Sequence, residues 1–205
     1  MNYRSIKRIL DILLSFLGLF LLLPIMIIFG ILIKIESPGP VLFRQKRVGE
    51  NKNYFYIYKF RTMKTDAPED IPTHHLKNPD QWITITGRIL RKTSLDELPQ
   101  MINIIKGEMS LVGPRPALWN QKNLIKEREK HGANDVPVGL TGWAQVNGRD
   151  QLTIEEKAKL DGEYARNRGF MMDVKCFFLT FYSVFRTKGV VEGGTGSLND
   201  SNEDS

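Results

Sequence analysis

The chain begins with a long apolar run and then changes to short segments of mixed polarity. Residues 12–33 are 22 uncharged, mostly large apolar residues in succession. At about 1.5 Å per residue, a helix of this length reaches roughly 33 Å, which is enough to cross a bilayer. The run is too long for a secretory signal peptide, and no Ala-x-Ala-like cleavage site follows it. The pattern therefore predicts a helix that stays in a membrane.

Two features of this run favour a re-entrant hairpin over a single span. Pro24 lies in its middle, where a proline removes a helical hydrogen bond and clashes with the preceding turn. Basic residues flank both ends: Arg4, Lys7 and Arg8 precede the run, and Lys34, Arg44, Lys46 and Arg47 follow it. Because basic residues prefer the cytoplasmic side, both ends are expected there. We expect residues 1–36 to form a helix, a break at Pro24 and a second helix, with a kinked spanning helix as the alternative.

Beyond residue 36 the pattern predicts a short hairpin followed by several helices. An apolar run at 41–43 and an aromatic run at 54–58 are typical of strands. Residues 66–80 are rich in proline and acids and predict a surface loop. Apolar spacing and stop signals predict helices at about 86–92, 97–106, 116–131 and 153–167. The apolar stretch 170–185 fits a buried helix and an interfacial helix equally well.

The predicted fold class is α/β and mostly helical, with three parts. Residues 1–36 form the membrane segment, residues 37–190 a small cytoplasmic domain, and residues 191–205 a mobile acidic tail. The domain contains the short β-hairpin and the amphipathic or interfacial helices.

Charge and cysteine content narrow the classes of function. The first 191 residues carry 29 basic and 19 acidic side chains, a net charge of +10, while residues 192–205 carry four acids and no base. A basic body suits nucleic acid, an anionic membrane or phosphorylated small molecules. No nucleic-acid module is recognisable, so no nucleic-acid partner is expected. The single cysteine, Cys176, excludes an internal disulfide, and His74, His75 and His131 have no metal-site spacing.

The segment 93–100, with sequence TSLDELPQ, contains the strongest candidate for chemistry. A capping box from Ser94 to Glu97 would make Pro99 the fifth helical residue, where proline is costly. With Asp96 as the cap, Pro99 falls third, where no intrahelical donor is needed. We therefore expect Asp96 at a helix start, ionised, beside N–H groups that also attract phosphate.

Nearby cations would let such a carboxylate attack a phosphate, and the sequence supplies several. Taken singly, a Lys or Arg is more often a solvated surface charge, but several stand beside rigid Gly/Pro turns: Lys59, Arg61, Arg88, Arg91, Lys92, Arg115 and Arg149. Two other interpretations stay open. Asp96 and Glu97 fit an acid/base pair of a hydrolase or glycosyltransferase, and the basic body fits a membrane-anchored adaptor.

Four ordered motifs lead to a family resemblance. They are KFRTM at 59–63, SLDELPQ at 94–100, GPRP at 113–116 and LTGWAQVNGR at 140–149. Together they resemble the bacterial sugar transferase family of monotopic phosphoglycosyl transferases, over nearly the whole chain to about Gly189. Two positions depart from the family pattern: Pro137-Val138-Gly139 stands for Arg-Pro-Gly, and Leu23 stands for a small polar residue before the helix-breaking proline.

The resemblance implies a two-step transfer. Asp96 would attack the β-phosphorus of a UDP-sugar, release UMP and hold the phosphosugar, which undecaprenyl phosphate then accepts. Mg²⁺ is expected near Asp96 and Glu97. The residues expected to line the site are Lys59, Arg61, Arg91, Arg115, Gln145, Arg149 and Asp173. The resemblance also places the enzyme in the bacterial inner membrane with its catalytic domain on the cytoplasmic face; the sugar, the glycan pathway and a homodimer stay open.

Overall fold

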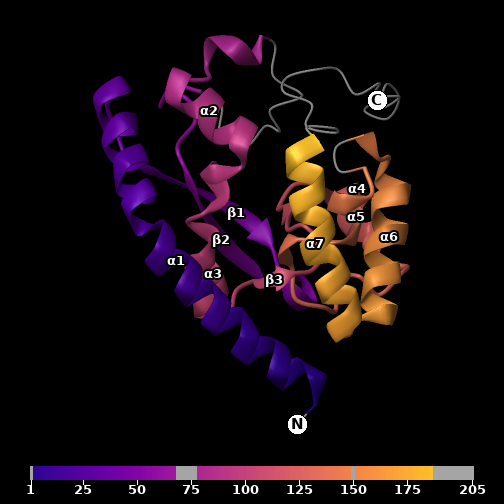
Figure 1. Ribbon diagram of the computed structural model, residues 1–205. Helices are drawn as coiled ribbons and strands as arrows, with labels where there is room; N and C mark the ends of the chain where they lie inside the picture. The colour runs from indigo at the N-terminus through magenta and orange to yellow at the C-terminus, as the bar shows by residue number, and fades with distance from the viewer. Residues whose placement is uncertain (1, 68–77, 149–150, 187–205) are drawn as a thin grey trace, which may run out of the picture.

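The computed structural model describes residues 2–67, 78–148 and 151–186 (Figure 1). In chain order its elements are α1 (Tyr3–Glu36), β1 (Leu42–Val48), β2 (Tyr54–Phe60), α2 (Ile85–Thr93), α3 (Gln100–Lys106), β3 (Ser110–Val112), β4 (Ala117–Leu118), α4 (Lys122–Glu129), β5 (Gly139–Thr141), α5 (Trp143–Val146), α6 (Ile154–Asn167) and α7 (Phe170–Arg186). Short 3₁₀ turns occur at Glu50–Lys52, Pro79–Gln81 and Leu95–Glu97. The predicted mostly helical fold with a small sheet is confirmed. The predicted acidic tail and most of the predicted 66–80 loop lie outside the described residues.

Helix α1 is a single helix of 34 residues that continues through Pro24. The two separate helices expected on either side of Pro24 are therefore not found. The physical reason is that a proline withdraws one backbone donor, while the other hydrogen bonds of a long helix remain. The re-entrant placement is a statement about the lipid and stays a prediction.

The two sides of α1 differ in polarity and exposure. Lys7, Asp11 and Ser15 are buried at a spacing of four residues, so they share one helix face, and Ile33 is buried near the other end. The most apolar 18-residue window of the helix is only 6% buried, so its large side chains point outward. Figure 1 shows α1 along one side of the molecule, with α6 and α7 along the other and the strands between them.

The core is built on two small sheets. One has the strand order β2-β1-β4 and is antiparallel; the other pairs β3 with β5 in parallel. On β2, Phe55 and Ile57 point inward and pack with Ile104 of α3, while the alternate tyrosines Tyr54 and Tyr56 are exposed. The strand predicted from the aromatic run is confirmed, and its side chains alternate between the two faces of the sheet.

The side chain of Asn103 in α3 covers the free edge of β2. Its amide oxygen accepts from the Tyr58 N–H at 3.0 Å, and its amide nitrogen donates to the Tyr56 carbonyl at 2.7 Å. Asn103 is completely buried, so these bonds replace the contacts that a further strand would make. The contact also fixes α3, which follows the Asp96-Glu97 pair, against the strand that carries Lys59.

Two predicted helices differ from the structure. The helix expected over 97–106 begins only at Gln100, after the 3₁₀ turn Leu95–Glu97. The helix expected over 116–131 is confined to α4, because Ala117 and Leu118 pair with Val48 and Arg47 as strand β4. The hairpin, α2, α6 and α7 agree with the predictions. Helix α7 has a buried side with Cys176 and an exposed side with Phe178, and contact of the exposed side with a membrane stays a prediction.

Candidate active site

Asp96 and Glu97 lie in a tight turn between α2 and α3. Ser94 ends α2 in the left-handed conformation, with φ of 57°, and the 3₁₀ turn Leu95–Glu97 follows at once. Helix α3 has Pro99 as its N-cap residue. The prediction that Asp96 caps a helix is therefore wrong. The reversal at Ser94 turns the chain so that Pro99 stands before α3 instead of inside it.

Glu97 forms the centre of a buried ion-pair group. Its Oε1 accepts from Lys59 Nζ at 2.7 Å and from Arg115 Nη2 at 2.6 Å. Burial opposes the charged form of Glu97, but Arg115 and Lys59 outweigh it and hold its pKa well below the usual range. Burial in turn lowers the pKa of Lys59, and the charge of Glu97 opposes that change. Glu97 therefore keeps two cations in place as a fixed negative charge.

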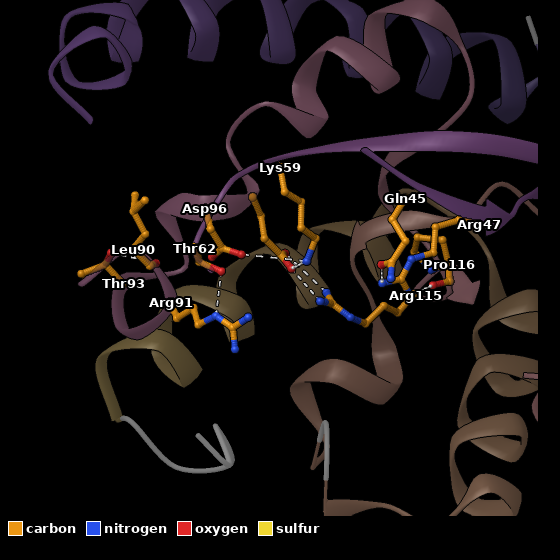
Figure 2. A network of polar contacts seen from close by, with 11 residues as sticks. Gln45, Arg47, Lys59, Thr62, Leu90, Arg91, Thr93, Asp96, Arg115 and Pro116 are labelled. Carbon is orange, nitrogen blue, oxygen red and sulfur yellow. Dashed lines mark hydrogen bonds and ion pairs between the residues drawn. The ribbon is translucent and has the colours of Figure 1, made fainter. Parts of the chain in front are cut away.

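Asp96 has a different environment from Glu97. Its side chain is only 14% exposed, its Oδ2 lies 3.9 Å from Lys59 Nζ, and no hydrogen bond to its carboxylate is found in the described part of the chain. Figure 2 shows Lys59, Arg91 and Arg115 around Asp96 from three segments of the chain, with Lys59 joined to Asp96 and Arg91 joined to Thr62. Burial raises the pKa of Asp96, Lys59 opposes this rise, and Glu97 adds to it. A buried carboxylate without hydrogen bonds, beside cations, can receive a ligand or act as a nucleophile.

Two further side chains support the cations: Thr62, which lies inside the KFRTM motif but was given no role there, and Arg47, which belongs to no motif. Thr62 Oγ1 accepts from Arg91 Nε at 2.9 Å, and Arg47 donates to the Pro116 carbonyl at 3.0 Å, which holds the loop that carries Arg115 (Figure 2). Burial lowers the pKa of Arg47, and the charge of Arg115 acts in the same direction. With three cations around two carboxylates, the group has an excess of positive charge that suits an anionic ligand. The pairing of Arg47 with β4 could have been suspected only if β4 had been predicted.

The other predicted site residues occupy different places. Arg61 is buried and donates to the Pro38 carbonyl at 2.6 Å and to the Ser37 carbonyl at 2.7 Å. It therefore binds the carbonyls at the end of α1, since β2 ends at Phe60 and Arg61 follows after the strand. The phosphate-binding role expected of Arg61 stays a prediction.

Asp173 belongs to a second polar cluster between α1, α6 and α7. It accepts from Tyr3 Oη at 2.6 Å, from Tyr164 Oη at 2.8 Å and from Lys7. These bonds fix the first turns of α1 to the domain. These contacts join Asp173 to α1 and α6, and no contact of Asp173 with Asp96 occurs among the residues the structure describes.

Gln145 remains a candidate, and Arg149 lies outside the described residues. Both amide atoms of Gln145 are buried without a hydrogen-bond partner in the described ranges. Buried polar atoms without partners are costly, so a ligand atom would stabilise this side chain.

The donor set is compatible with Mg²⁺ bound together with a substrate. No group of three or more His, Cys, Asp or Glu side chains that could hold a metal occurs among the residues the structure describes. Mg²⁺ is commonly held by one or two carboxylates, with phosphate oxygens and water completing the octahedron. Asp96, which has no hydrogen bond to give up, fits this pattern better than Glu97, whose Oε1 already binds two cations.

The fold thus combines a buried group of cations and carboxylates, which suits an anionic ligand, with a long exposed apolar helix. The chain belongs to the bacterial sugar transferase family, which it matches over residues 2–187. The family resemblance seen in the four motifs is confirmed.

Individual relatives support the same assignment. The chain is 40% identical over 192 residues to the UDP-glucose:undecaprenyl-phosphate glucose-1-phosphate transferase of Escherichia coli (strain K12), covering 90% of this chain and 41% of that protein. It is 36% identical over 190 residues to the UDP-N-acetylgalactosamine-undecaprenyl-phosphate N-acetylgalactosaminephosphotransferase of Aeromonas hydrophila, covering 89% and 44%. The uncharacterized sugar transferase EpsL of Bacillus subtilis (strain 168) is 40% identical over 167 residues, which is 81% of each chain. The chain thus spans less than half the length of the first two relatives and most of EpsL.

Proposed function

We propose that this chain transfers a phosphosugar from a UDP-sugar to undecaprenyl phosphate by way of a covalent intermediate on Asp96. The observation that carries the proposal is a buried carboxylate without hydrogen bonds, surrounded by Lys59, Arg91 and Arg115. The names of the E. coli and Aeromonas relatives describe the same type of transfer to the same lipid phosphate.

In the first step an Asp96 oxygen bonds to the β-phosphorus, which bears the sugar. The bond from this phosphorus to the bridging oxygen breaks, and UMP leaves with that oxygen. The cations around Asp96 make this attack feasible because they offset the repulsion between a carboxylate and a diphosphate. Arg91 and Arg115 are suited to hold phosphate oxygens in bidentate fashion. Glu97 holds Lys59 and Arg115 in position.

In the second step an oxygen of undecaprenyl phosphate bonds to the same phosphorus. The acyl-phosphate bond breaks, which frees the Asp96 carboxylate and leaves the phosphosugar on the lipid as a diphosphate. Mg²⁺, held by Asp96 with Glu97 nearby, would supply charge neutralisation on the diphosphate.

The lipid substrate requires a site at a membrane, and α1 provides the apolar surface. Both ends of α1 contact the same domain: Arg4 pairs with Glu50 at 3.0 Å, and Glu36 binds the start of α2. These contacts support a placement with both helix ends on the face where the domain lies, which we take to be cytoplasmic. Single cysteines at Asn2 and Glu50, in a chain whose Cys176 is buried, should then label from the same face of sealed vesicles. Labelling from opposite faces would replace this placement with a span.

The direct test is UMP release from a panel of UDP-sugars with undecaprenyl phosphate. Asp96→Asn should abolish UMP release, and no phosphosugar adduct of the variant should be trapped. Asp80→Asn, at an exposed position, should leave both UMP release and adduct formation unchanged. Near-normal release by Asp96→Asn would refute the covalent mechanism. The panel also identifies the sugar.

A further inference from the structure

The last residue of α1, Glu36, accepts hydrogen bonds from backbone N–H groups in the first turn of α2. Glu36 Oε1 accepts from the Ile85 N–H at 2.5 Å, and Glu36 Oε2 accepts from the Thr86 N–H at 2.9 Å. The next free donor, the Gly87 N–H, is bound by Thr84 Oγ1 at 2.9 Å. A helix leaves these first donors without internal partners, so Glu36 takes two of the three from outside the helix. The apolar helix α1 thus supplies part of the cap of α2.

The other end of α2 carries Arg91 into the active site. Its Nε donates to Thr62 Oγ1, and its charge acts on Asp96. Helix α2 also rests directly on the Thr62 backbone: a side chain at Gly87 would overlap the Thr62 carbonyl, and the Thr84 N–H donates to that carbonyl at 3.1 Å. At Gly87 the backbone of α2 lies directly against the Thr62 backbone, with no side chain between them. Because α2 is short, a tilt at its first turn would displace Arg91 in its last turn.

Hydrogen bonds run in both directions between the end of α1 and the segments that carry the active site. Arg61, which precedes Thr62, donates to carbonyls that follow the last turn of α1. Glu36, in that last turn, accepts from α2. The end of α1, residues 61–62 and the start of α2 are therefore closed into one ring of hydrogen bonds. Figure 1 shows α2 beside the end of α1 that lies away from the N-terminus.

We propose that Glu36 is a positioning residue that holds Arg91 in place through α2. It touches neither substrate nor Asp96; it fixes the tilt of the helix whose last turn presents the guanidinium. By this connection the seating of α1 in the membrane and the geometry of the phosphate site are coupled. The inference rests on the proposed function, because the role of Arg91 is to bind the diphosphate of the UDP-sugar.

A double-mutant cycle on kcat/KM for UMP release tests this role in the full chain in lipid nanodiscs. The variants are Glu36→Ala, Arg91→Ala, the double variant and Glu36→Gln, with Glu155→Ala as the matched control. Glu155 is an exposed acid in the first turn of α6. Glu36→Ala should lower kcat/KM about five- to thirtyfold, the range expected for a lost helix cap. Glu36→Gln, which keeps one oxygen acceptor, should fall between wild type and Glu36→Ala.

Comparing Glu36→Ala in the wild-type chain and in the Arg91→Ala variant separates a positioning role of Glu36 from a general structural role. If Glu36 acts through Arg91, adding Glu36→Ala to Arg91→Ala should change kcat/KM by less than about twofold. An equal loss in both backgrounds, or wild-type activity of Glu36→Ala, would overturn the proposal while leaving the transfer reaction intact. A wild-type chain that releases no UMP would instead refute the proposed function.

A second readout does not depend on activity. Amide exchange of residues 85–93 should accelerate in Glu36→Ala and be unchanged in Glu155→Ala, because the freed N–H groups begin this helix. Unchanged exchange in Glu36→Ala would also count against the role, including when that variant is too poorly active to assay.

Discussion

Replacing Glu97 with glutamine would leave Lys59 and Arg115 buried without their shared counter-charge. The two contacts, at 2.7 and 2.6 Å, are each worth about 6 kcal/mol at an effective dielectric constant of about 20, before desolvation is subtracted. The Glu97 side chain is 11% exposed, so solvent screens it little. Removing one partner of a buried pair costs about 3–5 kcal/mol of unfolding free energy. At about 2–4 °C per kcal/mol for a chain of this size, Tm should fall by about 6–20 °C.

Thermal unfolding in one detergent, followed by circular dichroism, measures this effect. The control is Glu129→Gln, which removes one charge from the exposed pair with Lys52. Exposed pairs contribute at most about 1 kcal/mol, so the control should shift Tm by less than about 4 °C. The double variant Lys59→Met/Glu97→Gln should recover part of the loss, because one uncompensated cation is then removed. A Tm for Glu97→Gln equal to that of the control would show that Glu97 does not neutralise buried cations.

Three further predictions concern Asp96, Asn103 and Arg61. Because the folded pKa of Asp96 is raised above its unfolded value of about 3.9, its charge opposes folding above the folded pKa. Asp96→Asn should therefore raise Tm at pH 7, and the gain should shrink as pH falls through the folded pKa and vanish below about 3.9; a gain that is constant over a pH series would contradict this. Asn103→Leu leaves the Tyr58 N–H and the Tyr56 carbonyl unpaired, so it should cost about 2–4 kcal/mol in thermal unfolding and speed amide exchange of β2, whereas unchanged exchange would show that the edge is covered otherwise. Arg61→Met should lower Tm because the carbonyls at the end of α1 lose their donor, but should leave KM for the UDP-sugar within about threefold. A rise of tenfold or more would instead support the phosphate-binding role expected from the sequence.

The sequence motifs predicted the charged residues around Asp96 better than they predicted the side chains that hold those residues in place. Lys59, Arg91, Arg115, Asp96 and Glu97 come from four separate segments, and the structure brings them together. The motifs that contain these residues follow one another along nearly the whole chain in the order typical of the family. This agreement in residue type and order was enough to predict that the five residues belong to one site.

The conformation of the turn before Glu97 could not be predicted. Ser94 adopts a positive φ, which residues other than glycine rarely do, so no propensity rule indicated that α2 would end there by reversing. Strands β3 and β5 have three residues each, too few to show an alternating pattern, and their pairing joins residues far apart in the chain. Asp173 lay in an apolar helix whose periodicity did not indicate that its partners would be Tyr3 and Lys7 of α1.

The segments before Arg115 and before Trp143 continue the parallel pair of β3 and β5 and pack against each other backbone to backbone. A side chain at Gly113 would overlap the Pro137 carbonyl, and one at Gly142 would overlap the Gly113 carbonyl. Two main chains at such close range cannot adjust to one another by exchanging rotamers. A side chain at Gly113 or Gly142 would therefore require both segments to be rebuilt together, whereas the side chains around these glycines can change without moving the two main chains.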